Sequence, residues 1–231
     1  VNVFVMTPVI GLILMCAGAI TILSAVLMAL VQHDYRKMLA FHAVSQVGYM
    51  VLGIGTGTPV GIIGGLFHML NHAIYKCCLF LCGGSVQRQT GRTEFAQLGG
   101  LARAMPWTFV TCLIAALAIS GVPPMNGFVS KWLVYQGIID SGNALFPLFL
   151  LVAMFGSALT LASFVKLLYS MFWGDRPPEL AEVKEASAWM IAPLVALAAF
   201  AVGFGVFYQF PVDYLIKPLL GANGLSVIIP G

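Results

Sequence analysis

The chain has 231 residues, of which 60% are hydrophobic and only 8% are charged, with a formal net charge of +3. A soluble domain usually carries about 25% charged residues, so this composition excludes an ordinary soluble domain. The small net charge also gives no indication of a nucleic-acid partner. Several apolar runs reach the roughly 20 residues that cross a bilayer as a helix, and they are too long and continuous for barrel strands. The composition therefore predicts an all-α, polytopic transmembrane helix bundle.

Six spans are predicted in chain order, within a single transmembrane domain over residues 1–231. The first three run from about 8 to 31, 35 to 55 and 59 to 86. The fourth begins near Pro106, is broken around 121–127 and ends near 140. The fifth and sixth run from about 144 to 173 and 187 to 209, and residues 210–231 are predicted to form an interfacial tail. Thr7-Pro8 is a typical helix start and sets the beginning of the first span.

The cations are distributed unequally between the two sides of this topology. One side receives seven of them: Arg36, Lys37, Arg88, Arg92, Arg103, Arg176 and Lys184. The other side receives only Lys217. The positive-inside rule places the first side in the cytoplasm, so an integral, multi-pass protein of a bacterial or archaeal cytoplasmic membrane is expected.

Three ionisable residues lie in register inside the third span. His68, His72 and Lys76 are spaced four residues apart, which places them on one face of a helix at a rise of about 6 Å between neighbours. Imidazole both donates and accepts a proton near neutral pH, and burial of an amine disfavours its charged form. The stripe predicts a proton relay. The alternative is three separately hydrogen-bonded polar groups at a helix interface, and a metal site is not expected because the ligand set is incomplete.

The fourth span contains a break that no regular helix tolerates, formed by Gly121, Pro123, Pro124 and Gly127. Non-helical backbone at membrane depth persists only where protein or water satisfies it, and such breaks mark ion pathways in transporters. Lys131 follows one turn later and is predicted near mid-membrane, as a second relay group. A lysine that snorkels to the surface is the alternative.

Other charged residues are less decisive. Lys166 in the fifth span is equally compatible with a relay and with snorkelling to the cytoplasmic face. Asp34, Arg36 and Lys37 form a charge cluster at the turn between the first two spans, and His42 continues a polar path along the second span. Five cysteines lie in apolar runs and are expected to pack as small apolar groups, so no metal or cofactor is predicted in this chain.

Four ordered stretches resemble a known family. Residues 34–49, DYRKMLAFHAVSQVGY, resemble D-x-K-R-x-L-A-Y-S-x-x-S-x-x-G-Y. Residues 68–81 resemble H-x-x-x-H-A-x-F-K-x-x-L-F-L, and residues 121–131 resemble G-x-P-P-x-x-G-F-x-S-K. Together with Gly99-Gly100-Leu101 and Met105-Pro106, these stretches look like the antiporter-like subunits of complex I, multisubunit cation/proton antiporters and membrane-bound hydrogenases. Two departures are Arg36-Lys37 for Lys-Arg and Phe41-His42 for Tyr-Ser.

The resemblance covers about residues 10–175 and only the second half of a fourteen-span subunit. It implies that Lys76 and Lys131 occupy the family's proton-relay positions, with His68 and His72 between water-filled half-channels. The expected function is a proton-translocating membrane subunit of a complex I-like or hydrogenase-like redox complex. The alternatives are a Na⁺(K⁺)/H⁺ antiporter subunit and a non-conducting structural subunit.

The resemblance also sets the expected partners. These are the lipid bilayer, protons (or Na⁺ or K⁺) and other membrane subunits, including antiporter-like paralogues. Redox cofactors are expected in partner subunits and not in this chain. Whether the chain is part of an enzyme depends on those partners, because no redox site is evident in its own sequence.

Overall fold

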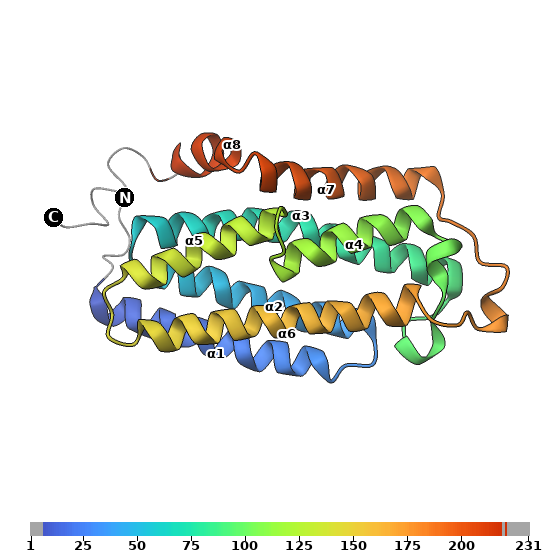
Figure 1. The fold of residues 1–231 in the computed structure, drawn as a ribbon, viewed down its shortest axis with the longest axis horizontal. Helices are drawn as coiled ribbons and strands as arrows, with labels where there is room; N and C mark the ends of the chain where they lie inside the picture. The colour runs from blue at the N-terminus through green and yellow to red at the C-terminus, as the bar shows by residue number, and fades with distance from the viewer. Residues whose placement is uncertain (1–6, 219, 221–231) are drawn as a thin grey trace.

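The chain forms a bundle of long helices that lie side by side (Figure 1). The computed structural model describes residues 7–218 and 220. The helices are α1 Pro8–Leu30, α2 Tyr35–Gly55, α3 Pro59–Thr90, α4 Pro106–Ser120, α5 Asn126–Asp140, α6 Phe146–Phe172 and α7 Ala188–Val206. Short 3-10 turns, η1 Phe95–Gln97, η2 Leu101–Arg103 and η3 Pro178–Leu180, lie in the connections, and α8 Gln209–Pro211 and the π-helical turn η4 Val212–Ile216 follow α7.

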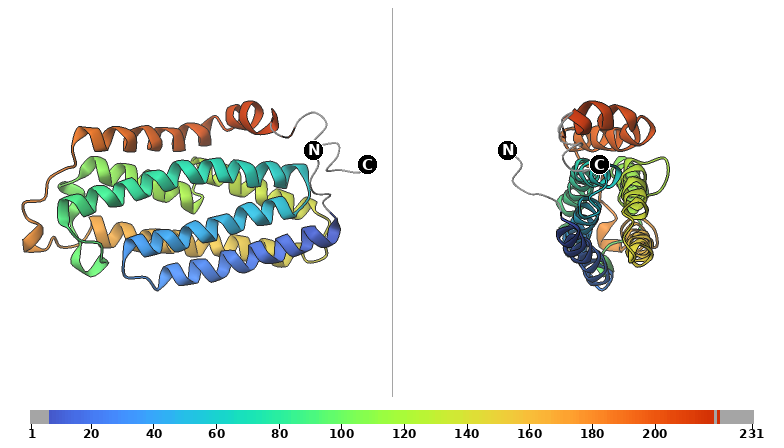
Figure 2. Two further views of the ribbon diagram at one scale, coloured as in Figure 1. Left: turned by 180° about the vertical axis from the view of Figure 1, so that it is seen from behind. Right: turned by 90° about the vertical axis from the view of Figure 1, so that its left-hand side faces the viewer.

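The helices are arranged in two layers, as the end-on view in Figure 2 shows. Helices α1, α2 and α3 form one layer, and α6 with the α4–α5 pair forms the other. Helix α7 packs along one edge, against α3, α4 and α5. Helices α4 and α5 meet near the middle of the bundle, so together they take the place of one long helix (Figure 1). This arrangement places the break about halfway along the bundle, with Pro123 and Pro124 exposed at its side.

The predicted polytopic bundle with one broken helix is confirmed. Within the described residues, four helices, α1, α2, α6 and α7, are long and apolar enough to cross a membrane by themselves. Helix α4 is apolar but shorter, and α3 is longer than predicted, since it continues to Thr90. The predicted tail begins as the helical turns of α8 and η4, and residues 221–231 lie outside the described residues. Its interfacial placement stays a prediction.

The connecting segments that carry most of the cations gather at one end of the bundle. The turn after α1 pairs with the segment after α3, through Tyr35 N to Thr93 O at 3.1 Å and Phe95 N to His33 O at 2.9 Å. The segment after α6 joins them, because Gly100 N donates to Trp173 O at 3.0 Å. The predicted segregation of charge is therefore present in the fold. Which side of the membrane this end faces stays a prediction.

Helices α1 and α2 approach each other closely through glycines. A Cβ atom added to Gly48 would lie 2.8 Å from Gly18 O, and one added to Gly18 would lie 2.7 Å from Gly48 O. Small residues of this kind allow backbones to pack closely in membranes, where helix association depends on van der Waals contact. The pair fixes the position of α2, which carries His42 and Gln46 into the interior.

Replacement of Gly48 by alanine should therefore destabilise the bundle. The added methyl group would overlap the α1 backbone, and overpacking of this kind costs about 1–3 kcal/mol. Thermal unfolding of the purified protein in detergent measures the effect. Gly84→Ala is the matched control, because a Cβ atom added to Gly84 meets nothing within 4 Å. Without such a clash, a glycine-to-alanine change inside a helix is favourable by about 0.5–1 kcal/mol. Equal melting temperatures for the two variants would contradict the packing argument.

Candidate functional site

The break between α4 and α5 is a well-formed helix end. Gly121 has a left-handed backbone with φ of 79°, which glycine adopts without steric strain. Gly121 N donates to Ala118 O at 3.1 Å, and Val122 N donates to Leu117 O at 3.0 Å. These two bonds make a Schellman motif, which satisfies two of the four carbonyls that a helix C-terminus leaves free. The carbonyl of Ile119 is among the four but accepts neither of these two hydrogen bonds.

Lys131 satisfies the carbonyl of Ile119. Its side chain is 2% exposed, and Nζ donates to Ile119 O at 2.9 Å. Nζ also lies 4.8 Å from the centre of the Tyr49 ring, within range of a cation–π interaction. The C-terminal end of a helix carries a partial negative charge, so the end of α4 stabilises an ammonium group at this position. Lys131 is thus buried and does not snorkel to the surface.

The start of α5 is fixed next to this helix end. A Cβ atom on Gly127 would lie 1.8 Å from Ala118 O, so only glycine allows α5 to begin there. Asn126 Nδ2 donates to Asn71 Oδ1, and Asn71 Nδ2 donates to Asn126 O, each at 3.0 Å. This reciprocal pair attaches the start of α5 to α3. These contacts hold the start of α5 against the end of α4, with Lys131 beside it.

A carboxylate occupies the other end of α4. Its N-cap residue, Met105, makes no side-chain capping bond. Glu185, in the segment before α7, takes this role: Oε2 accepts from Trp107 N at 2.8 Å and from Thr108 N at 3.3 Å, and Oε1 accepts from Thr108 Oγ1 at 2.7 Å. Helix α4 thus has an anion at its positive end and a cation at its negative end, as the helix dipole favours.

The stripe on α3 is present and faces α2 and α5. His68 is fully buried, with Nδ1 2.8 Å from Ser130 Oγ and Nε2 3.1 Å from Gln46 Oε1. Lys76 is 5% exposed, and its Nζ donates to the carbonyl of Leu39 in α2. His72 is half-buried and packs against the ring of Tyr75. Since Ser130 precedes Lys131 in α5, His68 connects the stripe to the break.

Several buried polar atoms near the α3 stripe have no hydrogen-bond partner in the part of the chain that the structure describes. They are both ring nitrogens of His42, Nε2 of Gln46 and Nδ1 of His72. His42 is fully buried and its ring lies 4.9 Å from that of Phe164. A buried donor without a partner costs about 1–3 kcal/mol, and ordered water normally removes that cost. The buried row, which consists of the α3 stripe, His42 and Gln46 of α2, and Lys131 of α5, therefore has the polar lining that a hydrated path needs.

A cavity of about 210 Å³ extends from Lys131 toward the surface between the α4–α5 pair and α6. Ser120, Tyr135 and Ser157 line it with hydroxyl groups. Ser157 Oγ lies 2.7 Å from Tyr135 OH and 2.9 Å from Tyr49 OH, so the cavity and the Tyr49 ring over Lys131 share one hydroxyl cluster. Phe128, Trp132 and Met154 complete the lining on the outer side of the cavity.

Lys166 is not part of the row. Its Nζ donates to Leu30 O at 3.0 Å and to Gln32 O at 2.9 Å. These carbonyls belong to the C-terminal end of α1, at the cation-rich end of the bundle. Lys166 thus caps α1, and the structure shows no contact between it and the α3 stripe.

The Asp34 cluster also lies at the cation-rich end. Asp34 caps α2 by accepting from Arg36 N at 2.8 Å and from Lys37 N at 3.2 Å, and Arg36 forms an ion pair with it at 3.6 Å. Burial by itself would raise the pKa of Asp34. The hydrogen bonds from Thr93 Oγ1 and from the two amides outweigh burial and hold this pKa below its usual value. The cluster joins two connecting segments, and its described hydrogen bonds and ion pair do not include Lys76 or Lys131.

Comparison with known proteins assigns the family. The model of the transmembrane family "NADH:quinone oxidoreductase/Mrp antiporter" matches residues 1–160. The chain belongs to this family. It is an integral, multi-pass membrane protein, as its helices and its structural relatives indicate.

Three relatives show the range of the family. Hydrogenase-4 component B of Escherichia coli K12 is 34% identical over 83% of this chain and 31% of its own length. A Na(+)/H(+) antiporter subunit of Alkalihalophilus pseudofirmus is 34% identical over 84% of this chain and 38% of its own length. A chain of an archaeal membrane-bound sulfane sulfur reductase has a TM-score of 0.83 and 35% identity, over 90% of this chain and 34% of that one. The chain thus spans about a third of the length of these relatives.

The cap on α4 is testable by replacement of its carboxylate. Glu185→Gln keeps an acceptor for the α4 amides but removes the charge, and Glu185→Ala removes both. We expect losses of about 1 kcal/mol and about 2 kcal/mol in the free energy of unfolding, because hydrogen bonds to charged groups are the stronger ones. Thermal unfolding in detergent gives the order of the two variants. Glu182→Gln, an exposed neighbour in the same segment, is the control, and equal stability of all three variants would exclude the cap.

Proposed function

We propose that this chain forms the later part of a proton-translocating membrane subunit, in which protons pass along the α3 stripe to Lys131. The observation that carries the proposal is a pair of buried amines, Lys76 and Lys131, whose described hydrogen bonds go only to backbone carbonyls. An amine with a carboxylate partner is held in its charged form. An amine bonded to a neutral carbonyl can release its proton at a smaller cost.

The histidines provide the connection between the two amines. On α3, His68 lies one turn from His72 and two turns from Lys76. It also contacts Ser130, the residue before Lys131. Imidazole passes a proton by accepting at one nitrogen and donating from the other. The unpartnered atoms of His42, Gln46 and His72 favour water between these groups, and a water bridges steps that side chains alone do not span.

The driving reaction belongs to other subunits in this proposal. The relatives include a hydrogenase component and a chain of a sulfur reductase, so a redox partner that carries its own cofactors fits the family. The residues described here contain no group of metal ligands. We propose that the redox cofactors lie in those partner subunits and that this chain responds to them through the charge states of its buried amines.

A second candidate is Na⁺(K⁺)/H⁺ exchange, which the Na(+)/H(+) antiporter relative favours. Hard cations prefer oxygen ligands, and carboxylates above all. All eight Asp and Glu residues of the chain lie at helix ends, in connecting segments or in η4, away from the buried row. A cation would therefore depend on the hydroxyl groups of the 210 Å³ cavity and on free carbonyls. Because these ligands are neutral and hard cations prefer carboxylates, proton transport remains the first candidate.

Replacement of the two amines tests the relay. Lys76→Met and Lys131→Met should each lower proton transport by at least about tenfold while the complex still assembles, because the row loses a group that exchanges protons. Proton uptake by proteoliposomes that contain the complete complex, with a pH-sensitive dye, measures transport. Lys184→Met, an exposed lysine at the cation-rich end, is the control.

Lys131→Arg separates a relay from a fixed charge. Arginine keeps the positive charge at the end of α4 but does not release its proton in proteins. A relay predicts that Lys131→Arg is as defective as Lys131→Met. A non-conducting structural subunit predicts that the arginine variant, or even both variants, transports at the rate of the unmodified complex, and that result would reject the proposal.

The ion is tested with the same proteoliposomes. Proton transport driven by the redox partner should have the same rate with and without Na⁺ or K⁺ in the medium. Exchange of cations predicts that a Na⁺ gradient alone moves protons, and that Ser157→Ala, which removes a hydroxyl ligand from the cavity, weakens the dependence on Na⁺. Proton movement only in the presence of a cation gradient would favour the second candidate.

A further inference from the structure

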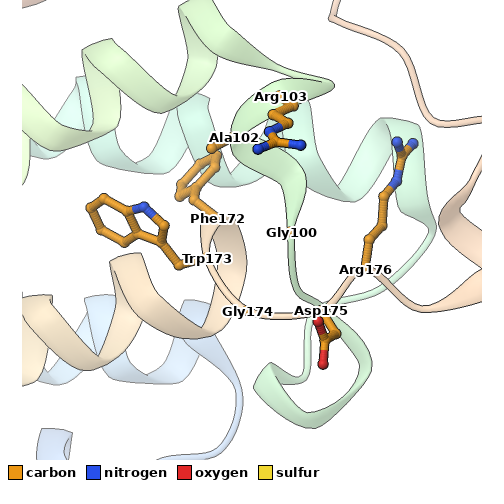
Figure 3. Close-up of a pocket in the computed structure, with 8 residues that line it drawn as sticks. All are labelled: Gly100, Ala102, Arg103, Phe172, Trp173, Gly174, Asp175 and Arg176. Carbon is orange, nitrogen blue, oxygen red and sulfur yellow. The ribbon is translucent and has the colours of Figure 1, made fainter.

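A second pocket lies at the cation-rich end, away from the relay row. It has a volume of about 600 Å³ and is formed by two segments, the turn around η2 and the segment that follows α6 (Figure 3). Its lining includes Arg103, Arg176, Phe172 and Trp173. Pockets of about 300–1,000 Å³ are large enough to hold a small ligand or a headgroup.

The two segments are held together by glycines. Gly100 N donates to Trp173 O at 3.0 Å, and a Cβ atom on Gly100 would lie 2.8 Å from Arg176 Cβ. Gly100 has φ of 60° and Gly99 would place a Cβ 2.5 Å from Asp175 O. The close approach that these glycines allow brings Arg103 and Arg176 to the same pocket. The pocket is therefore a fixed part of the fold.

The two guanidinium groups have donors to spare. Neither arginine forms an ion pair within the described chain. Arg176 Nη2 donates to Val183 O at 2.9 Å, which holds the side chain, while its Nε is buried and has no described partner. Asp175 also lines the pocket, but Figure 3 shows its carboxylate on the opposite side of the loop from both guanidinium groups. The pocket thus offers an anion several donors and two positive charges.

The position of the pocket relative to the bilayer indicates the source of the anion. Trp173, just after α6, is 46% exposed, and Trp107, at the start of α4, is 58% exposed. Tryptophan concentrates at the level of lipid headgroups, where its ring is half in contact with hydrocarbon and half with water. Helix α4 begins here and α6 ends here, which is the level expected for lipid headgroups. Basic pockets at this level suit anionic headgroups, and the predicted cytoplasmic side of this end is the side where such lipids concentrate.

We propose that this pocket binds the phosphate group of an anionic phospholipid, with Arg103 and Arg176 as its donors and Trp173 beside the glycerol. Guanidinium groups match the planar arrangement of phosphate oxygens and bind them through pairs of hydrogen bonds. The site is separate from proton transport and does not depend on it. The lipid would join the connection before α4 to the end of α6, since one arginine comes from each segment.

Native mass spectrometry of the purified full-length protein tests the site, with phosphatidylglycerol as the probe and phosphatidylcholine as the neutral comparison. Arg103→Gln and Arg176→Gln should each weaken phosphatidylglycerol binding about five-fold, and together about twenty-five-fold, from the contribution of one basic residue at an anionic surface. Arg88→Gln, an exposed arginine at the same end of the bundle but outside the pocket, should leave binding unchanged.

Two further measurements keep the result clear. Arg103→Lys preserves charge and should retain binding better than Arg103→Gln, which separates a lost contact from a misfolded variant, and equal melting temperatures check the fold. Binding of phosphatidylcholine as tight as that of phosphatidylglycerol, or an equal loss with Arg88→Gln, would overturn the proposal. Arginine-dependent binding of inorganic phosphate without any preference for phosphatidylglycerol would overturn the lipid assignment.

Discussion

Lys131 can lie in the interior of the bundle because the chain interrupts its own helix beside it. An ammonium group in hydrocarbon has a large desolvation cost, and a helix end offers carbonyls that accept no backbone hydrogen bond to offset it. The Schellman turn at Gly121 ends α4 one residue after Ile119 and leaves that carbonyl for Nζ at 2.9 Å. The packing of Gly127 against Ala118 and the Asn71–Asn126 pair hold this geometry, so the position of the amine depends on the break.

Local signals predicted much of the fold. Thr7-Pro8 marked the start of α1, and Thr7 Oγ1 does accept from Ile10 N. The prolines and glycines of 121–127 marked the break, and the spacing of His68, His72 and Lys76 marked a common face. These features were accessible because capping, helix breaking and periodicity depend on residues within a few positions of one another. The length of α3 was underestimated, since its last turn continues beyond the apolar run until Gly91 caps it.

Contacts between distant segments were not accessible in the same way. Nothing local to Glu185 indicates that it caps α4, whose first amides are 77 and 78 residues away. Likewise, the sequence left Lys166 undecided, and only the packing of α6 against α1 shows that its amine bonds Leu30 and Gln32. Ser130 and Ser157 are ordinary polar residues in sequence. They gain a place at the site only because α5 and α6 bring them to His68 and to the cavity beside Lys131.

The absence of carboxylates beside the buried amines bears on how the proposed relay would work. With no carboxylate bonded to Lys76 or Lys131 among the described residues, each ammonium group contacts a backbone carbonyl and an aromatic ring, and Lys131 also lies at the end of α4. A carboxylate next to either lysine would hold its charge in place. In the proposed relay, the charge state of each amine would instead respond to a proton or another charge that arrives near it.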